Sequence, residues 1–275
     1  FPDFTHIWLE TPQPGAEFVV VYALLSGPSV AGAYRFRMHR GKGVVMEIET
    51  ALFLRKDVER LGIAPLTSMY WYSETAKATA VDWRPEVHDS DGVGHYLDGV
   101  FYERRPSLWV ETQGDWGKGA VQLIEIPTDD EIHDNIVAMW VPAGPARAGA
   151  SFAFRYRLHW LADEPFPTVL GRVVATRLGN GGPPGTTRPK GVRKFMIEFR
   201  GPALETIAFG VKPEVVLSAS RGTFSYVFAE AVPNDVPGHW RAQFDLTVEG
   251  SDPVEMRCFL KAGETVLTET WLYQY

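Results

Sequence analysis

Two clusters of carboxylate side chains stand in one aromatic-rich stretch of the chain. The first cluster is His88-Asp89-Ser90-Asp91-Gly92, and the second is Thr128-Asp129-Asp130-Glu131-Ile132-His133-Asp134-Asn135, directly before the apolar residues 136–140. Paired carboxylates supply acid and base chemistry, while flat aromatic rings cover the apolar faces of sugars. Aromatic residues near the clusters include Tyr96, Tyr102, Trp109, Trp116 and Trp140. This combination of residue types indicates a carbohydrate site.

Each cluster also has a purely structural interpretation. Asp and Ser before Gly commonly form a turn by hydrogen-bonding their own backbone, which alone would explain residues 88–92. Asp134-Asn135 would likewise form a turn or cap the entry to a strand. A calcium loop at residues 88–92 is disfavoured, because the further oxygen ligands and the closing Glu of an EF-hand are missing. Against the turn interpretation, four carboxylates crowd residues 129–134 and repel one another unless something protonates or binds them.

The composition excludes several classes of function. The chain has 275 residues, of which 45% are hydrophobic, and its formal net charge is -7. It has no block of Lys or Arg, so we expect no nucleic-acid partner. No apolar run reaches the roughly 20 residues that span a bilayer, and the common nucleotide and zinc motifs are missing. We therefore expect a globular protein with no membrane span, no cofactor and no metal.

The single cysteine leaves the cellular compartment open, because a protein of this size without a disulfide can be cytosolic, periplasmic or secreted. Cys258 is the single cysteine, so no internal disulfide forms, and its alternation with Met256 and Leu260 predicts a buried strand residue rather than a nucleophile. The chain begins at Phe1 without a charged-then-apolar leader, so we expect Phe1 not to be the translational start and the export signal not to be in this chain.

Alternation of apolar and polar residues runs through much of the chain and is typical of half-buried antiparallel strands. It predicts strands within residues 34–39, 152–160, 195–199, 224–228, 240–246 and 256–260. Only Leu54 to Leu61, followed by Gly62 and Pro65, has a helical pattern longer than one turn. The fold class is therefore predicted to be mainly β.

The clearest boundary is the segment 162–192, where prolines and the glycine-rich run 179–185 interrupt any core pattern. We predict a first domain over residues 1–161, a Pro/Gly-rich linker over 162–192, and a second domain over 193–275. About seven short strands in the second domain match the spacing of an immunoglobulin-like sandwich, although the Cys-Trp-Cys signature is missing.

The tryptophans divide into two groups. We expect Trp160, Trp240 and Trp271 to lie in cores, since most tryptophans of a β-sandwich do. Other aromatic residues stand beside turn residues or charges, and for them a core position and a position facing a groove both stay open. These are Tyr70, Trp71, Tyr72, Trp109 and Trp116.

Several long strings closely resemble the osmoregulated periplasmic glucan biosynthesis proteins G and D. They are GIAPLTSM at 62–69, RPEVHDSDG at 84–92, RPSLWVE at 105–111, WGKG at 116–119, DNIV at 134–137 and ETWLYQY at 269–275. Residues 172–177 and 252–257 resemble the D branch more than the G branch. The resemblance covers nearly the whole chain.

This resemblance implies a large galactose-mutarotase-like β-sandwich, of which only the C-terminal part is present, followed by an immunoglobulin-like β-sandwich. It also implies a periplasmic location and action on β-1,2-linked glucan as an inverting endo-glucanase. By motif match, Asp134 takes the place of the family's general acid, and Asp89 that of the residue at the base end of a proton relay to the attacking water. The same resemblance and its matching strings suggest that substrate contacts come from Glu131, Tyr102, Arg105, His88 and Trp116.

The chain departs from the family in two respects. The family is about twice as long, so the N-terminal half of the large sandwich is not in this chain. Between Gly92 and His95 the family also carries several dozen further residues. We expect these segments to have been omitted from the sequence rather than lost, because excised strands would leave uncovered sheet edges.

Two alternatives to the hydrolase stay open. One is a non-catalytic β-glucan-binding or chain-organising protein, which would keep the aromatic groove but would not need an acid and a base on opposite sides. The other is a transglycosylase on the same scaffold, in which a sugar hydroxyl replaces water. The sequence leaves open the preferred chain length and the oligomeric state, including a homodimer.

Overall fold

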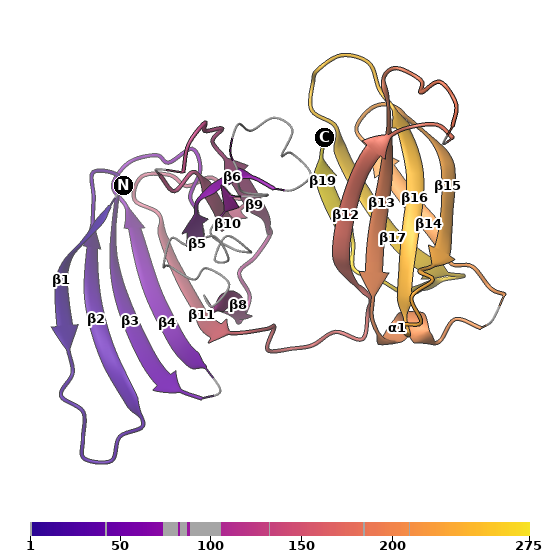
Figure 1. The fold of residues 1–275 in the computed structure, drawn as a ribbon. Helices are drawn as coiled ribbons and strands as arrows, with labels where there is room; N and C mark the ends of the chain where they lie inside the picture. The colour runs from indigo at the N-terminus through magenta and orange to yellow at the C-terminus, as the bar shows by residue number, and fades with distance from the viewer. Residues whose placement is uncertain are drawn as a thin grey trace. The chain divides into compact units, whose positions relative to one another are not determined.

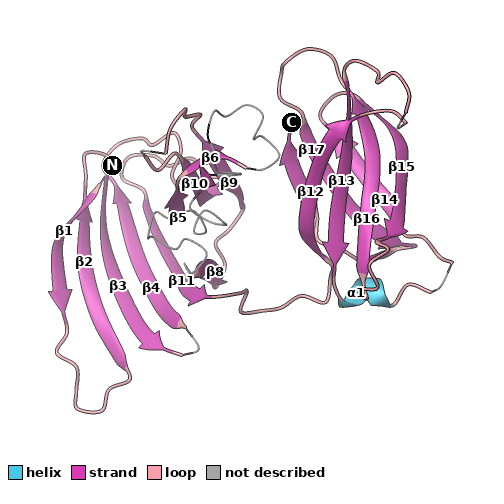
Figure 2. Cartoon of the chain, viewed as in Figure 1, coloured by secondary structure: helices cyan, strands magenta, loops and turns pink. Residues whose placement is uncertain are grey.

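The structure, a computed structural model, describes residues 2–41, 43–73, 82, 87–88, 106–131, 133–183, 185–208 and 210–275. In these residues the regular structure is almost entirely β-strand, and the one helix, α1, spans only Pro202–Glu205 (Figure 2). The chain forms two compact units, Phe1–Phe166 and Pro167–Tyr275 (Figure 1). The prediction of a mainly β protein built from antiparallel sheets is confirmed.

The first unit contains a six-stranded antiparallel sheet in the order β1-β2-β3-β4-β11-β8. Its strands are β1 (Asp3–Leu9), β2 (Phe18–Ser26), β3 (Val30–Arg40), β4 (Val44–Leu54), β11 (Ser151–Leu161) and β8 (Ser107–Gln113). The predicted strands at 34–39 and 152–160 lie within β3 and β11. The last two strands, β11 and β8, come from far along the chain and pair side by side.

One face of this sheet forms the core of the first unit. Buried there are Ile48, Leu52, Phe154 and Tyr156, packed with half-buried Trp116 and Trp140. Successive side chains of a strand point to opposite faces, so Glu47 and Arg157 lie on the other face. That face therefore carries charged residues, while the core face is apolar.

A smaller sheet in the first unit carries the loop 126–135, which contains the second carboxylate cluster and is called the acid loop below. Its order is β5-β10-β9, with β5 (Ile63–Ser68), β10 (Ile136–Pro142) and β9 (Gly119–Glu125). Ile136 pairs with Glu125 across β10 and β9, so the ends of the intervening loop 126–135 are held together. A further pair of short strands, β6 (Tyr70–Tyr72) and β7 (Val87–His88), follows β5 in the chain.

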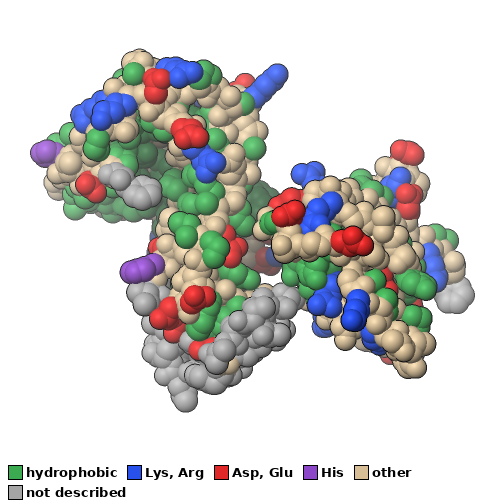
Figure 3. Space-filling model, turned by 90° about the horizontal axis from the view of Figure 1, so that it is seen from above, with side chains coloured by type: hydrophobic (Ala, Val, Ile, Leu, Met, Phe, Trp, Pro, Cys, Tyr) green, Lys and Arg blue, Asp and Glu red, His purple; other side chains and the backbone are tan. Residues whose placement is uncertain are grey.

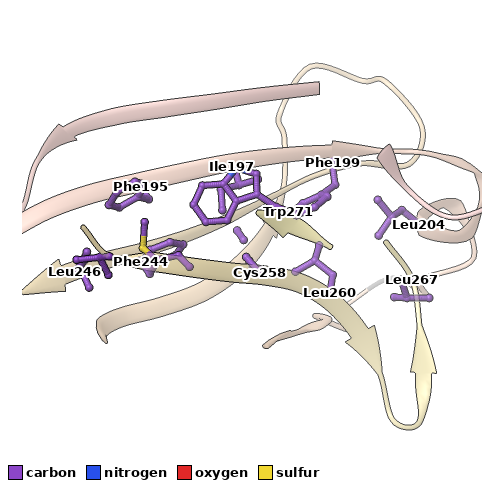
Figure 4. Close-up of a cluster of buried hydrophobic side chains, with 14 residues drawn as sticks. Phe195, Ile197, Phe199, Leu204, Phe244, Leu246, Cys258, Leu260, Leu267 and Trp271 are labelled. Atoms are coloured by element: carbon purple, nitrogen blue, oxygen red, sulfur yellow. The ribbon is translucent and has the colours of Figure 1, made fainter. Parts of the chain in front are cut away.

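The second unit is a sandwich of two antiparallel sheets, ordered β12-β13-β16-β15 and β14-β17-β18, with β19 also paired to β17. The strands are β12 (Arg172–Asn180), β13 (Val192–Arg200), β14 (Glu214–Ala219), β15 (Thr223–Ala231), β16 (His239–Thr247), β17 (Glu255–Ala262), β18 (Thr265–Val266) and β19 (Trp271–Gln274). Figure 4 shows side chains of both sheets, among them Phe195, Phe244 and Leu260, in one apolar core. Seven strands follow one another from β13 onward, as the spacing predicted.

Two predicted core residues lie where the alternation placed them. Cys258 is fully buried on β17, and burial raises the pKa of its thiol to about 12, so it is not a reactive thiolate at neutral pH. Trp271 on β19 is buried, and its indole N–H donates to Thr176 Oγ1 of β12 at 3.0 Å. This hydrogen bond joins the two sheets across the core.

The helix predicted over Leu54 to Leu61 is wrong. Leu54 is the last residue of β4, and the next backbone N–H groups donate to distant carbonyls rather than to a helix: Arg55 N–H to Ser29 at 2.8 Å, and Val58 N–H to Ala146 at 2.8 Å. The apolar spacing that resembles a helix arises because the turn brings Val58 and Leu61 back to the core.

The segment 162–192, predicted as a linker, contains the strand β12. Eight residue pairs join β12 to β13, with a shift in register between Val173 and Ala175. This irregularity breaks the period-two pattern on which the strand predictions depended. The glycine- and proline-rich run begins only at the end of β12.

Candidate active site

Asp134 lies in the loop between β9 and β10, two residues before β10 begins. Its carboxylate is exposed and makes no hydrogen bond or ion pair with the residues that the structure describes. A carboxylate that shapes a turn would accept hydrogen bonds from nearby backbone N–H groups. The turn interpretation therefore does not account for Asp134.

The turn interpretation does fit another acid of the same loop. Asp130 Oδ1 accepts a hydrogen bond from the backbone N–H of Glu131 at 2.8 Å, and Thr128 Oγ1 donates to the backbone oxygen of Asp130 at 2.9 Å. Asp129, Glu131 and Asp134 are all exposed beside it. The loop thus separates a carboxylate with a local structural role from carboxylates that face solvent.

Asn135, the residue after Asp134, anchors the loop. Its side-chain amide donates to the backbone oxygens of Tyr70 at 2.7 Å and Ile126 at 2.8 Å. Its Oδ1 accepts from the backbone N–H of Tyr70 at 2.8 Å. The residue is only 7% exposed, so these bonds satisfy a carboxamide that water does not reach freely. The local sequence indicates only a turn or a cap at Asn135 and contains no signal of this anchoring role.

The strand that Asn135 contacts leads toward the other acid cluster. In the pairing of β6 with β7, Tyr70 lies opposite His88 and Tyr72 opposite Val87. Tyr72 and Val87 are buried in a small core with Met69, which fixes this strand pair. The strand β7 ends at His88, directly before Asp89 in the sequence. Asp89, Tyr102 and Arg105 lie outside the described residues, as does the side chain of His88.

Trp116 is half-buried between β8 and β9 rather than displayed on an open surface. Its indole N–H donates to the backbone oxygen of Arg155 at 3.1 Å, and its ring makes edge contacts with Trp140, Phe154 and Tyr156. It also lines a surface hollow together with Arg35, Glu49, Gln113 and Arg155. Asp134 and Glu131 are not among the described residues that line this hollow.

The other aromatic residues that stand beside turns differ in exposure. Tyr72 is buried and belongs to the small core, so its position is settled. Trp109 on β8 is 39% exposed and meets Phe166 edge-on, with ring centroids 6.4 Å apart. Of these two, only Trp109 presents ring surface to solvent.

The described residues show no clustered set of metal ligands and no membrane-spanning helix. They contain no group of three or more His, Cys, Asp and Glu side chains that could hold a metal ion. None of their helices has both the length and the apolar character that crossing a membrane requires. Acidic and basic side chains are interspersed on the molecular face drawn in Figure 3.

The fold and the acid loop define a two-unit antiparallel β protein with an exposed loop carboxylate as its candidate catalytic group. The sequence profile of the family described as "Periplasmic glucan biosynthesis protein, MdoG" matches residues 1–94 and 93–275. The chain belongs to this family. Its similarity to relatives named glucans biosynthesis protein D places it on the D branch, as the sequence predicted.

Three of these relatives show the extent of the similarity. Glucans biosynthesis protein D 2 of Ralstonia nicotianae is 63% identical over 318 residues, which include 100% of this chain and 59% of the relative. Glucans biosynthesis protein D of Stenotrophomonas maltophilia is 42% identical over 320 residues, with 100% and 60% covered. The protein of that name from Xanthomonas campestris pv. campestris is 42% identical over 322 residues, again with 100% and 60% covered. The chain thus spans about three fifths of the length of these curated relatives.

The alignments also locate an internal difference. The two profile matches meet at residues 93–94. The alignment with the Ralstonia relative runs over 318 residues, although this chain has 275. The aligned stretch is therefore longer than this chain. Additional residues of the relatives between Gly92 and His95 stay a prediction.

Proposed function

We propose that the protein is an inverting endo-β-1,2-glucanase that processes osmoregulated glucans in the periplasm. The observation that carries this proposal is the family match over the whole chain, because the family's description concerns periplasmic glucan biosynthesis and its relatives' names concern glucan biosynthesis. The acid loop supports a hydrolytic role within that biosynthesis, since a glycosidase requires two carboxyl groups with different tasks.

Asp134 is the proposed general acid. Its carboxyl group is exposed and is not engaged by the described residues, so a sugar oxygen can approach it. In the proposed reaction, Asp134 gives its proton to the glycosidic oxygen as the bond to the anomeric carbon breaks. General acid catalysis of this kind contributes roughly 100- to 10,000-fold in rate.

Asp89 is the proposed base, acting through a proton relay on the water that attacks the anomeric carbon from the opposite face. Inversion requires room for this water, and the two carboxyl groups of inverting enzymes stand about 6.5 to 9.5 Å apart, compared with about 5 to 5.5 Å in retaining enzymes. Placing acid and base on two loops of the chain suits that requirement. The proposed reaction uses neither a metal nor a cofactor.

Substrate contacts are proposed from five residues that the family resemblance suggests. Glu131 and Arg105 would hydrogen-bond sugar hydroxyls, and His88 and Tyr102 would line the same site. Trp116 would contribute at its surface hollow, where Arg35 and Arg155 offer further hydrogen-bond donors. Aromatic rings and hydrogen-bonding side chains of this kind can bind a neutral sugar through its apolar faces and its hydroxyl groups.

The test is incubation of the purified protein with linear β-1,2-glucan, with the products resolved by size and linear β-1,3-glucan as the control substrate. An endo-glucanase shortens the average chain early, because it cuts internal bonds, and leaves the control intact. Binding without shortening would instead favour the glucan-binding protein. Products longer than the starting chains would favour the transglycosylase.

A further inference from the structure

We infer that Asn135 is a positioning residue, which fixes the loop of the general acid onto the strand pair that leads to the proposed base. This inference rests on the proposed function, because it assigns Asn135 a task in that reaction. Asn135 itself is buried and does not touch substrate in this account. It acts through its covalent neighbour Asp134 on one side and through Tyr70 on the other.

The contact with Tyr70 replaces a strand pairing. In a β-strand, the N–H and C=O of one residue point to the same edge. At Tyr70, both of these groups bond to the Asn135 carboxamide, at 2.8 and 2.7 Å. The Asn135 side chain therefore hydrogen-bonds the backbone of β6 at Tyr70, while β7 pairs with β6 through Tyr70↔His88 and Tyr72↔Val87. The acid loop, β6 and β7 thus form one connected unit.

The backbone of Asn135 is fixed as well. Its N–H donates to the backbone oxygen of Ser68 at 3.1 Å, and its C=O accepts from the N–H of Ile126 at 2.8 Å. With the side chain also bonded to Ile126, the residue ties the start of β10 to the end of β9 and to the β5–β6 segment. These contacts fix the backbone at Asn135 and so constrain the position of Asp134, the residue directly before it.

Asparagine meets a demand that few side chains satisfy. The site needs one acceptor and two donors in a plane, which a carboxamide provides. Aspartate would lose both donors and bring a charge into a buried site, and alanine would remove all three side-chain hydrogen bonds to the backbone of Tyr70 and Ile126. A displacement of about 1 Å in a catalytic group can cost about 100-fold in rate, so loss of this anchor should reduce turnover.

The test compares Asn135→Ala with Ile48→Ala, a core variant of β4 remote in sequence from the acid loop. Both variants should lower the melting temperature, because one leaves polar groups unpaired and the other leaves a cavity. The kcat and KM for linear β-1,2-glucan are measured at a temperature at which circular dichroism shows each variant folded. Asn135→Ser, which keeps one donor and one acceptor, gives a milder version of the change if Asn135→Ala does not fold.

We expect Asn135→Ala to lower kcat by about 10- to 100-fold while KM changes by less than about threefold, with Asn135→Ser in between. Hydrogen exchange at the Tyr70 amide should become faster in both Asn135 variants, since that N–H loses its acceptor or bonds to it less well. Ile48→Ala should keep kcat within about threefold of the wild type, even where its loss of melting temperature is as large.

Three outcomes would overturn the inference: an unchanged kcat in Asn135→Ala, a loss of kcat in Ile48→Ala of the same size, or an effect confined to KM. If the wild-type protein cleaves glucan and the Asn135 variants behave like Ile48→Ala, the inference fails while the proposed function stands. A wild-type protein that does not cleave glucan would overturn the proposed function, and this inference with it.

Discussion

At the scale of single residues, Asp134 and Asn135 are neighbours with opposite environments. The Asp134 carboxylate is exposed and makes no bond with the described residues, whereas the Asn135 carboxamide is buried and bonded at both its oxygen and its nitrogen. The chemical group and the structural group of this loop are therefore two separate residues. Substitution of Asp134 should therefore affect catalysis alone, whereas substitution of Asn135 should affect both stability and catalysis.

Asp134→Asn should abolish most glucan cleavage without changing stability. Asparagine keeps the shape of the side chain but cannot donate the acidic proton, so we expect kcat to fall by roughly 100- to 10,000-fold. The melting temperature should stay close to that of the wild type, because the carboxylate makes no contact with the described residues. The glucan affinity should also change little, because aromatic rings and contacts to sugar hydroxyls supply most of it. Steady-state kinetics, binding by calorimetry and thermal unfolding on one preparation would check all three.

The matched control is Asp129→Asn, another exposed acid of the same loop that makes the same change in charge. It should leave kcat within about threefold of the wild type, because Asp129 has no assigned role in proton transfer. Unchanged cleavage in Asp134→Asn together with weakened binding would contradict the catalytic assignment and favour the binding protein.

The sequence could predict the acids of this loop but not their division of labour. The density of carboxylates is a local property and is visible in residues 129–134. The partner of Asn135, however, is Tyr70, which lies 65 positions earlier in the chain. Local patterns contain no information on such a contact, so the local sequence predicts the same turn or cap for Asn135 as for Asp134.

At the scale of elements, the six-stranded sheet carries a row of ion pairs on its charged face. Glu47 on β4 bonds to Arg37 on β3 at 3.0 Å and to Arg157 on β11 at 3.3 Å, and Arg157 reaches Glu111 on β8 at 3.4 Å. These residues are direct cross-strand partners, so the row follows the register of four adjacent strands. The hydrogen bond from Arg37 and the charges of Arg37 and Arg157 together lower the pKa of the Glu47 carboxyl against the effect of burial.

A folded-state pKa below the unfolded value means that Glu47 stabilises the fold above its unfolded pKa of about 4.3, and that this contribution is lost as the pH falls through the folded value. We expect Glu47→Gln to lower the free energy of unfolding by about 1 kcal/mol at pH 7. The difference from the wild type should begin to shrink as the pH falls below the unfolded pKa of Glu47 and should vanish once the pH lies below its lowered folded pKa. Urea unfolding across the pH range measures it.

Glu49→Gln is the control for this row. Glu49 forms an ion pair with Arg35 at 3.3 Å, and both side chains are more exposed than those of the Glu47 pairs. Its substitution should cost about 0.3 kcal/mol or less. A loss in Glu47→Gln that persisted unchanged at pH 3 would assign the effect to packing instead of charge.

The elements show where sequence patterns succeed. Strict alternation predicted strands in β3, β11, β13, β15, β16 and β17, and all six are present. A buried face and a more exposed face alternate most clearly in β13 and β17. The pattern failed at β12, whose register shifts between Val173 and Ala175. It also failed at Leu54–Leu61, where apolar residues at helical spacing return to the core through a turn.

At the scale of the whole molecule, each unit has its own core. Among the described residues, the buried core cluster of the second unit runs from Phe195 to Trp271 in the sequence and includes no residue of the first unit. We expect the fragment 167–275 to fold by itself, with a cooperative thermal transition and without glucan cleavage, because the acid clusters lie outside it. Circular dichroism and an activity assay of the fragment would check this. A broad, non-cooperative transition would show that the second unit depends on the first.

The order of strands within the sheets is the part of the fold that the sequence could not supply. Consecutive strands β1 to β4 pair as neighbours, which short connections favour. The placement of β11 between β4 and β8 depends on contacts between distant segments, and no local pattern encodes it. The class and the individual strands were therefore predictable, whereas the arrangement that brings β6 beside the acid loop was not.

The most direct test of the central claim is the anomeric configuration of the first products. The purified protein is mixed with linear β-1,2-glucan, and the new reducing ends are followed by proton NMR before mutarotation equilibrates them. An inverting enzyme with Asp134 as its acid releases the α-anomer first from a β-linked chain, and Asp134→Asn releases almost none. Initial release of the β-anomer, or no new reducing ends at all, would contradict the account.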